Sequence, residues 1–349
     1  MVEASNGNAR EAGNMSAREA RDTSARGTRT VLVTGGNSGI GYECARALAK
    51  AGHHVVIASR SRRASDQAVS RIASEAGSDR IEAMELDLAS PESIRELVAA
   101  IDARDLALEA LVCNAGLQFT KGPVLSEKGY ELTFAVNHLG HFLLVNLLLS
   151  RLLASAPARI VVVSSGVHDS KRFTGMPKAN VTDMQTLAAT GCASRERFNG
   201  GLAYVNSKLC NLWFSYELAR RLAVAGIGSG NQVLAINAFD PGLVPGSGLA
   251  REYPGWMQFV WSQVMPAMAA GLTRFVPSIS TAEKSGAALA QLVLDPRLAA
   301  PGARYYPSHT RWYESPSSDQ SYDAGRAGEL WEASVGMSGL ARGESPLLA

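Results

Sequence analysis

The sequence lacks the residue patterns that mark disulfide-stabilised, metal-binding and nucleic-acid-binding proteins. Its four cysteines, at positions 44, 113, 192 and 210, form no CxxC pair and no spacing typical of a metal site. We therefore expect reduced thiols, no bound metal and a cytoplasmic location. The formal net charge of +2 over 349 residues gives no reason to expect a nucleic-acid partner.

Long apolar runs are also missing. No apolar segment of the kind found in secretory signals opens the chain, and acidic residues interrupt its first positions, which argues against a transit peptide. The longest candidate for a membrane-spanning segment, 256–276, is broken by Gln258, Gln263, Pro266 and Arg274. We therefore predict no integral membrane span.

The chain divides into three parts by composition. Residues 1–28 are polar and nearly free of large apolar side chains, which predicts a disordered leader. With 46% hydrophobic residues the chain can bury a large core, and we expect one α/β domain over 29–310. Residues 311–349 are expected to form a C-terminal extension and tail.

Glycine is concentrated where one predicted strand meets one predicted helix. A β-branched run at 31–34 ends in a turn with glycines at 35, 36, 39 and 41, and a helical pattern follows at once. Glycines let the backbone approach a ligand closely, and the first turn of a helix presents free N–H groups to an anion. A plain strand–helix connection would have the same composition, but the pyrophosphate of a dinucleotide is the expected ligand. Its contacts would come from Gly35, Asn37, Ser38, Gly39, Ile40 and Gly41.

The second predicted strand, 52–58, ends without an acidic residue. An acid at this place accepts hydrogen bonds from a free ribose 2′-hydroxyl, whereas arginine favours a 2′-phosphate. The sequence has Arg60 here, followed by Arg62 and Arg63, which favours NADP(H) over NAD(H). For Arg62 and Arg63, the solvated start of a helix is an equally good explanation.

Predicted strands and helices then alternate, which indicates a parallel sheet with ligands at the carboxyl ends of its strands. Polar residues stand at several of these ends: Thr34, Ser59, Asp87 before Leu88, and Asn114 before Ala115 and Gly116. The next helix, predicted over 127–153, is apolar nearly all round in its later half, which implies burial against the core or a partner subunit. His138 and His141 on this helix are expected to be structural, whereas Asn137 needs polar partners and is a candidate to hold water or brace a neighbouring turn.

A tyrosine and a lysine four positions apart, Tyr204 and Lys208, open a helix predicted to run over 209–223. Residues at this spacing lie on one helix face. An ammonium beside a phenol stabilises the phenolate and lowers the pKa of the tyrosine, which makes it a usable acid or base near neutral pH. Ser165 follows the preceding strand, and the segments 167–200 and 249–275 carry no catalytic motif. Both are predicted to enclose the substrate, the second as a lid or as core.

Together, these residues resemble the short-chain dehydrogenase/reductase family over about 29–310. The residues that carry the resemblance are Thr34, Gly35, Gly39, Ile40, Gly41, Asp87, Leu88, Asn114, Ala115, Gly116, Asn137, Ser165, Tyr204, Lys208, Pro241 and Gly242. The resemblance implies a single Rossmann-type, doubly wound domain with a mainly parallel seven-stranded sheet. It also implies a homodimer or homotetramer formed through the two long helices, which fits the apolar residues at 142–153.

The resemblance further implies a role for each site residue. Tyr204 would exchange a proton with the substrate oxygen, Ser165 would hydrogen-bond that oxygen, and Lys208 would bind the nicotinamide ribose. Asn137 would hold a water in the proton relay. Asp87 would contact adenine and Val244 the carboxamide, with Leu88, Asn114, Ala115, Gly116, Pro241 and Gly242 completing the cofactor site.

Within this family, the chain is similar to retinol-dehydrogenase-like enzymes and to light-dependent protochlorophyllide oxidoreductases. The second likeness includes the segments 137–144, 177–180, 207–211, 285–286 and 290–292. The chain differs where the photoenzymes usually have Asn-Ala-Ala, Pro-Gly-Cys and Tyr-Lys-Asp-Ser-Lys, at Gly116, Leu243, Val205 and Asn206.

The sequence therefore predicts an NADP(H)-dependent reductase or dehydrogenase acting on a carbonyl or alcohol of a bulky, mostly apolar small molecule, with Tyr204 as acid/base. Light-dependent reduction of a C=C bond in a protochlorophyllide-type pigment is the alternative. A non-catalytic NADP-binding sensor or scaffold is a second alternative.

Overall fold

The computed structural model describes residues 27–191, 198–245, 279–308 and 313–348. Positions 1–26 of the predicted leader and the whole predicted substrate-enclosing segment 249–275 lie outside these residues. Cys192 is also outside them, and the other three cysteines are free and buried.

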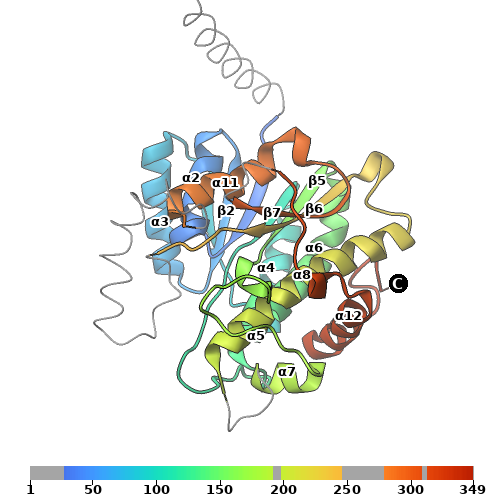
Figure 1. The fold of residues 1–349 in the computed structure, drawn as a ribbon. Helices are drawn as coiled ribbons and strands as arrows, with labels where there is room; N and C mark the ends of the chain where they lie inside the picture. The colour runs from blue at the N-terminus through green and yellow to red at the C-terminus, as the bar shows by residue number, and fades with distance from the viewer. Residues whose placement is uncertain (1–26, 192–197, 246–278, 309–312, 349) are drawn as a thin grey trace, which may run out of the picture.

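A parallel sheet of seven strands forms the centre of the molecule, in the order β3-β2-β1-β4-β5-β6-β7 (Figure 1). The central strands β1, β4 and β5 are apolar and almost entirely buried, because helices cover both faces of the sheet. The predicted Rossmann-type architecture is thereby confirmed. The strands are β1 Thr30–Thr34, β2 His54–Ser59, β3 Ile81–Glu85, β4 Ala110–Cys113, β5 Ala158–Val163, β6 Leu234–Asp240 and β7 Gly302–Pro307.

Helices form a layer on each side of this sheet (Figure 1). One layer contains α2 Gly39–Lys50, α3 Arg62–Ala76 and α11 Ala282–Leu294, whose apolar residues share one buried cluster with β1 and β2. The other contains α4 Pro91–Ala103, α6 Gly140–Ala154, α8 Gly200–Val224 and α12 Ala324–Ser338. Shorter elements are α5 Leu132–Phe134, the π-helix η1 Ala135–Leu139, α7 Met184–Thr190, and the 3-10 turns η2 Gly166–His168, η4 Gly230–Gln232, η7 Pro296–Leu298 and η9 Asp319–Tyr322.

The helix that carries the tyrosine and the lysine begins earlier than the sequence predicts. Asn199 caps α8, with its Oδ1 accepting the N–H of Leu202 at 3.0 Å. Tyr204 and Lys208 therefore lie inside the first turns of α8 rather than in front of it. Helix α4 begins at Pro91, and Ser90 caps it, with its Oγ accepting the N–H of Ser93 at 3.1 Å.

One continuous helix, 132–154, passes the length and composition test for a membrane span, although the sequence analysis found no long apolar run. Its 23 residues are long and apolar enough by composition, but 89% of its most apolar window is buried inside the protein. It is therefore a core helix of the fold.

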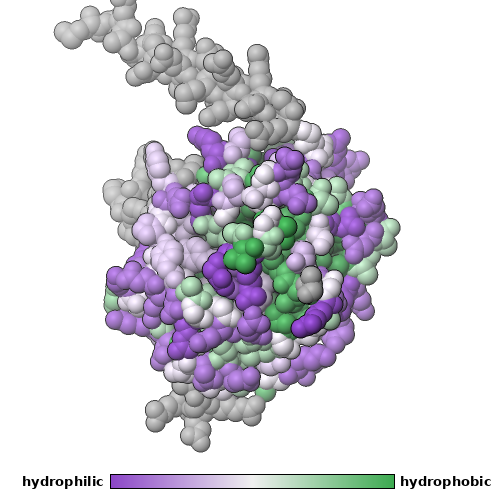
Figure 2. Space-filling model, turned by 90° about the vertical axis from the view of Figure 1, so that its right-hand side faces the viewer, coloured by the Kyte–Doolittle hydropathy of each residue, from purple (hydrophilic) through white to green (hydrophobic). Residues whose placement is uncertain are grey.

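The C-terminal part of the chain contains a helix where the sequence suggested only an extension and a tail. Helix α12 packs against α8 and α6, and Trp331 on it is 1% exposed. The Trp331 ring meets the ring of Phe142 in α6 edge-on, with the ring centres 4.9 Å apart. It stacks on the ring of Phe214 in α8, with the ring centres 6.1 Å apart. The apolar residues of α6 are thus covered within one chain. Figure 2, which views the molecule from the right-hand side of Figure 1, shows apolar residues near the middle of that face, bordered by hydrophilic ones.

Candidate active site

The glycine turn joins β1 to α2 and leaves the start of that helix open. Gly35 and Gly39 have φ angles of 66° and 58°, which favour glycine. Ser38, the N-cap residue of α2, makes no side-chain cap hydrogen bond, and the first turn holds no acidic residue. In contrast, the N-cap side chains of α3, α4, α8, α11 and α12 each accept a backbone N–H. The first N–H groups of α2 are therefore available to an anion.

The turn closes tightly against the end of β4. A Cβ on Gly41 would lie 2.5 Å from Gly35 O and would collide with the Asn114 side chain. Asn114 Nδ2 donates to Thr34 O at 2.9 Å, and a Cβ on Gly35 would lie 3.0 Å from Ala115 Cα. The structure thus brings together the predicted residues of the glycine turn and of the Asn-Ala-Gly strand end.

Thr34 connects this turn to the helix that carries Asn137. The backbone N–H groups of Asn114 and Ala115 donate to Thr34 Oγ1 at 2.9 and 3.0 Å. His141 lies with Nδ1 3.1 Å from Asn137 O and Nε2 2.8 Å from Thr34 Oγ1. Because a carbonyl only accepts, Nδ1 carries the hydrogen and Nε2 accepts from the threonine. Burial lowers the pKa of His141 to about 4, and both ring nitrogens lie within hydrogen-bond distance of groups inside the fold.

Asn137 lies in the π-helical turn η1 and is completely buried. Its Oδ1 accepts the N–H of Leu117 at 2.8 Å, while Nδ2 is 3.0 Å from both Leu117 O and Ser207 Oγ. Asn137 therefore braces the loop that follows β4, one of the two uses that the sequence left open. A Cβ on Gly116 would lie 3.4 Å from Asn137 Oδ1 and 3.6 Å from Lys208 Nζ, so the three residues meet at one point.

Tyr204, Lys208 and Ser165 come together at the carboxyl end of β5. Lys208 Nζ lies 5.5 Å from the centre of the Tyr204 ring and donates to Val163 O at 3.1 Å. The Ser165 side chain is hydrogen-bonded to Tyr204. Tyr204 and Lys208 are 8% and 3% exposed, whereas Ser165 is only half-buried. A buried phenol with a lysine and a serine beside it is an arrangement able to donate a proton to an oxygen atom.

The pKa of Tyr204 is shifted in the direction opposite to the one that the sequence predicts. Burial raises the pKa of Tyr204, the negative charge of Asp240 raises it further, and only the hydrogen bond to Ser165 lowers it. Burial also lowers the pKa of Lys208 to about 8. Because Lys208 donates to Val163 O rather than to the phenol, the expected lowering of the tyrosine pKa by the lysine is absent in this structure. Tyr204 is a neutral phenol here, in the state that gives up a proton.

The end of β6 contributes a buried carboxylate, Asp240, which is not among the site residues predicted from the sequence. Asp240 is 2% exposed, and its Oδ1 accepts the N–H of Gly242 at 2.9 Å. Its Oδ2 accepts from the hydroxyl of Tyr305 at 3.2 Å and lies 3.5 Å from Arg172 Nη1. The signal available in the sequence was an acidic residue at the end of a mostly apolar strand. Val244, further along the same loop, is buried.

The remaining predicted cofactor residues lie at the ends of β2 and β3. Arg60 is exposed directly after β2, and no hydrogen bond or ion pair of its side chain occurs within the part of the chain that the structure describes. Arg62 forms an ion pair with Asp66 at 2.9 Å, one turn along α3, as the solvated-helix explanation predicts. Asp87 Oδ1 accepts the N–H of Ala89 at 2.9 Å.

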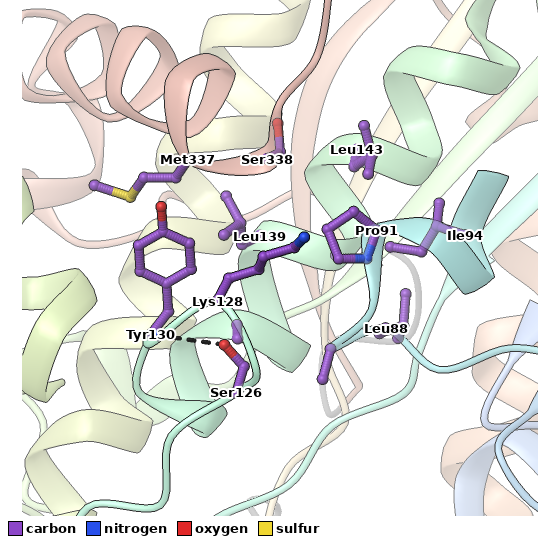
Figure 3. A pocket seen from close by; sticks show the side chains of 13 residues that line it. Leu88, Pro91, Ile94, Ser126, Lys128, Tyr130, Leu139, Leu143, Met337 and Ser338 are labelled. Atoms are coloured by element: carbon purple, nitrogen blue, oxygen red, sulfur yellow. Dashed lines mark hydrogen bonds between the residues drawn. The ribbon is translucent and has the colours of Figure 1, made fainter.

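A small hollow of about 20 Å³ lies next to this site and shares Leu88 with the predicted cofactor residues. Figure 3 shows its wall of Leu88, Pro91, Ile94, Leu139 and Leu143, with the end of α12 opposite. Ser126, Lys128 and Tyr130 also line the hollow, and Lys128 forms an ion pair with Glu92 at 2.8 Å. Tyr204, Lys208 and Ser165 are not among its lining residues.

Comparisons with known proteins agree on one family. The profile described as "short chain dehydrogenase" matches residues 29–177. The human WW domain-containing oxidoreductase is 37% identical over 307 residues, which are 88% of this chain and 67% of that protein. The chloroplastic protochlorophyllide reductase of Chlamydomonas reinhardtii is 33% identical over 326 residues, which are 89% of this chain and 78% of that protein.

The fold is also found among solved structures. An uncharacterized protein from Mycobacterium paratuberculosis is 28% identical in sequence, with a TM-score of 0.61. The match covers 89% of this chain and 93% of the other.

Proposed function

Because the chain belongs to the short-chain dehydrogenase/reductase family, we propose that it is an NADP(H)-dependent oxidoreductase acting on a carbonyl or alcohol of a bulky, mostly apolar small molecule. The observation that carries this proposal is the meeting of Tyr204, Lys208 and Ser165 at the carboxyl end of β5, beside Asn137. A hydride transfer to a carbonyl carbon leaves a negative oxygen, and a neutral phenol held next to a serine hydroxyl is suited to protonate it.

The cofactor would lie across the carboxyl ends of the strands. NADP(H), when bound, supplies or takes up the hydride. The uncapped N–H groups of α2 fit a pyrophosphate held by Gly35, Asn37, Ser38, Gly39, Ile40 and Gly41. Arg60 would contact the 2′-phosphate and Asp87 the adenine, with Leu88, Asn114, Ala115, Gly116, Pro241, Gly242 and Val244 along the rest of the site.

Four side chains would act on the substrate or the cofactor. In the reducing direction, the Tyr204 hydroxyl donates its proton to the substrate oxygen while Ser165 hydrogen-bonds the same oxygen. Lys208 would leave Val163 O and bind the nicotinamide ribose, which also brings its charge closer to the phenol and lowers the pKa of Tyr204. Asn137, next to Lys208 across Gly116, would hold a water that returns the proton.

Replacement of Tyr204 by phenylalanine tests this mechanism. Loss of the proton donor should lower kcat by about 10²–10⁴-fold with the KM for NADPH little changed. NADPH absorbance is followed against a panel of apolar ketones, aldehydes and alcohols. Tyr42→Phe is the matched control, because the Tyr42 hydroxyl bonds Glu75 of α3 and no predicted site residue, so this change should leave kcat unchanged. Near-normal turnover by the Tyr204→Phe protein would contradict the proposal.

Light-dependent reduction of a C=C bond is the second candidate, favoured by the 33% identity to the algal protochlorophyllide reductase. It requires that the protein convert protochlorophyllide with NADPH only under illumination. Absence of product in the light excludes it. A protein that binds NADPH but turns over neither the pigment nor any member of the panel would be the sensor or scaffold.

We also propose an assembly and a cellular location for the protein. The family resemblance implies a homodimer or homotetramer formed through the long helices. However, α12 packs on α6, whose apolar residues were the argument for that interface. A second copy would therefore use another surface. Light scattering in solution, compared with the chain mass of 36.9 kDa, tests the assembly. A cytoplasmic location is tested by fractionation.

A further inference from the structure

His168 links the catalytic loop to a part of the chain 150 positions later. It lies in η2, three residues after Ser165, and is 1% exposed. Its Nδ1 is 2.6 Å from Ser165 O, and its Nε2 is 3.2 Å from the backbone nitrogen of Ser318. The ring edge also packs against Tyr305 of β7, with the ring centres 5.4 Å apart.

These two contacts fix the tautomer of the imidazole. A carbonyl oxygen only accepts a hydrogen bond, so Nδ1 must carry the hydrogen that Ser165 O receives. A backbone N–H only donates, so Nε2 must be without a hydrogen to accept from Ser318. Only the neutral ring protonated at Nδ1 makes both bonds.

The residues around Ser318 are themselves held in place. The indole Nε1 of Trp213 donates to Gln320 O at 2.8 Å, and the Tyr216 hydroxyl lies 2.7 Å from Ser317 Oγ. Lys171, in the loop after His168, pairs with Asp319 at 2.6 Å. Trp213 and Tyr216 belong to α8, the helix that also carries Tyr204 and Lys208. The segment 317–322 is therefore fixed both to the catalytic helix and to the loop that contains Ser165.

We infer that the segment 317–322 positions Ser165 through His168. The N–H of Ser318 can bond only to the ring tautomer that donates a hydrogen bond to Ser165 O. His168 is then a positioning residue: it touches no reacting atom, but it fixes the backbone from which the Ser165 hydroxyl reaches Tyr204. The inference deepens the proposed function and rests on it. It makes part of the C-terminal extension a component of the active site.

A proline at position 318 removes the link with little other change. Ser318 has a φ angle of −72°, which a proline ring adopts, and proline lacks the N–H that His168 accepts. Ser318→Ala is the matched control, because it keeps the N–H and removes only a hydroxyl that makes no hydrogen bond within the described residues. We expect kcat to fall about fivefold to tenfold in Ser318→Pro and less than twofold in Ser318→Ala. The KM for NADPH should stay the same in both, because the glycine turn is on other strands.

Nitrogen-15 NMR of the imidazole gives a second readout that does not depend on activity. In the unaltered protein, His168 should show the neutral form protonated at Nδ1, and Ser318→Pro should shift it toward a mixture of the two tautomers. A ring protonated at Nε2 in the unaltered protein overturns the inference, whether or not the proline variant folds. Equal kcat values for the two Ser318 variants, with unchanged melting temperatures, overturn it as well. Full activity of Tyr204→Phe would instead remove the proposed function and leave the NMR result standing.

Discussion

Arg60 is the side chain whose charge should distinguish the two nicotinamide dinucleotides. It is exposed at the end of β2, with no partner in the described part of the chain. A hydrogen-bonded pair with a phosphate is worth about 1.5–3 kcal/mol, so Arg60→Ala should raise the KM for NADPH about tenfold or more and leave that for NADH unchanged.

The control for this prediction is Arg62→Ala, because Arg62 is already paired with Asp66 along α3. Steady-state kinetics with both cofactors give the result. An equal rise of KM for NADH would show that Arg60 supports the fold of the site and does not read the 2′-phosphate.

His138 makes the fold sensitive to acid. It is surrounded by the rings of Phe134, Phe142 and Phe214, and its Nε2 lies 2.9 Å from Ser334 Oγ of α12. Burial lowers its pKa from 6.5 to about 3, and the charge of His141 lowers it further. In the unfolded chain, His138 binds a proton near pH 6.5, whereas in the folded protein it stays neutral down to a much lower pH. The free energy of unfolding therefore falls as the pH drops below 6.5.

Between pH 7.5 and pH 5, this protonation lowers the free energy of unfolding by about 2 kcal/mol. The His138→Gln protein lacks the titrating group, so the drop in its free energy of unfolding over the same range should be smaller by about 2 kcal/mol than that of the unaltered protein. Urea unfolding at the two pH values measures the difference. Parallel pH dependence of the two proteins would mean that His138 is protonated in the folded state.

A local sequence pattern predicts which residues of one motif lie close together, but it does not predict contacts between distant parts of the chain. The pair Tyr204 and Lys208 is recognisable because one helix turn places both on one face. The contacts of Asp240 and His168 come from Tyr305 and Ser318, 65 and 150 positions away. No local pattern encodes such distances, so neither contact was predictable without the fold.

Helix α6 approaches the loop after β3 so closely that only glycine fits at its first residue. A Cβ on Gly140 would collide with Leu88 O, and the backbone on both sides is held in the core. Gly140→Ala should therefore lower the free energy of unfolding by about 1–3 kcal/mol.

Gly328 in the middle of α12 is the matched helical control. A Cβ there would meet nothing within 4 Å, so Gly328→Ala should raise the free energy of unfolding by about 0.5–1 kcal/mol through helix propensity. Chemical denaturation of both variants tests the pair. A change of the same sign in both would refute the argument from close approach.

The strands were predictable to within about two residues, because a sheet covered on both faces needs apolar runs. The start of α8 was not, since Gly200 and Gly201 read as a loop. Asn199 caps the helix there, and a Cβ on Gly200 would collide with Phe119 O, so glycine serves packing at that point. Helix α12 was missed because it contains three glycines, at 325, 328 and 336, which are poor helix formers, and its stability comes from tertiary contacts.

At the scale of the whole molecule, Trp331 joins the C-terminal extension to the core. Its ring packs against Phe142 and Phe214, and Arg221 lies 4.7 Å above it. Trp331→Ala should lower the free energy of unfolding by about 3–5 kcal/mol. Glu329→Ala, on the exposed face of the same helix, should change it by less than about 0.5 kcal/mol. A small effect of the tryptophan change, seen by thermal or urea unfolding, would mean that α12 is dispensable for the fold.

The proposed division into a leader at 1–28, a domain at 29–310 and an extension at 311–349 stays a prediction. The contacts of Trp331 and Ser318 show only that residues of the extension pack on helices of the central part.

The order of these aromatic residues along the chain also matters during synthesis. A polypeptide leaves the ribosome from its N-terminus, so Phe142 and Phe214 emerge before the Trp331 ring that covers them. Until Trp331 has emerged, the nascent protein exposes apolar residues of α6 and α8, which are a natural target for chaperones. Docking of α12, rather than completion of the sheet, then closes this part of the core.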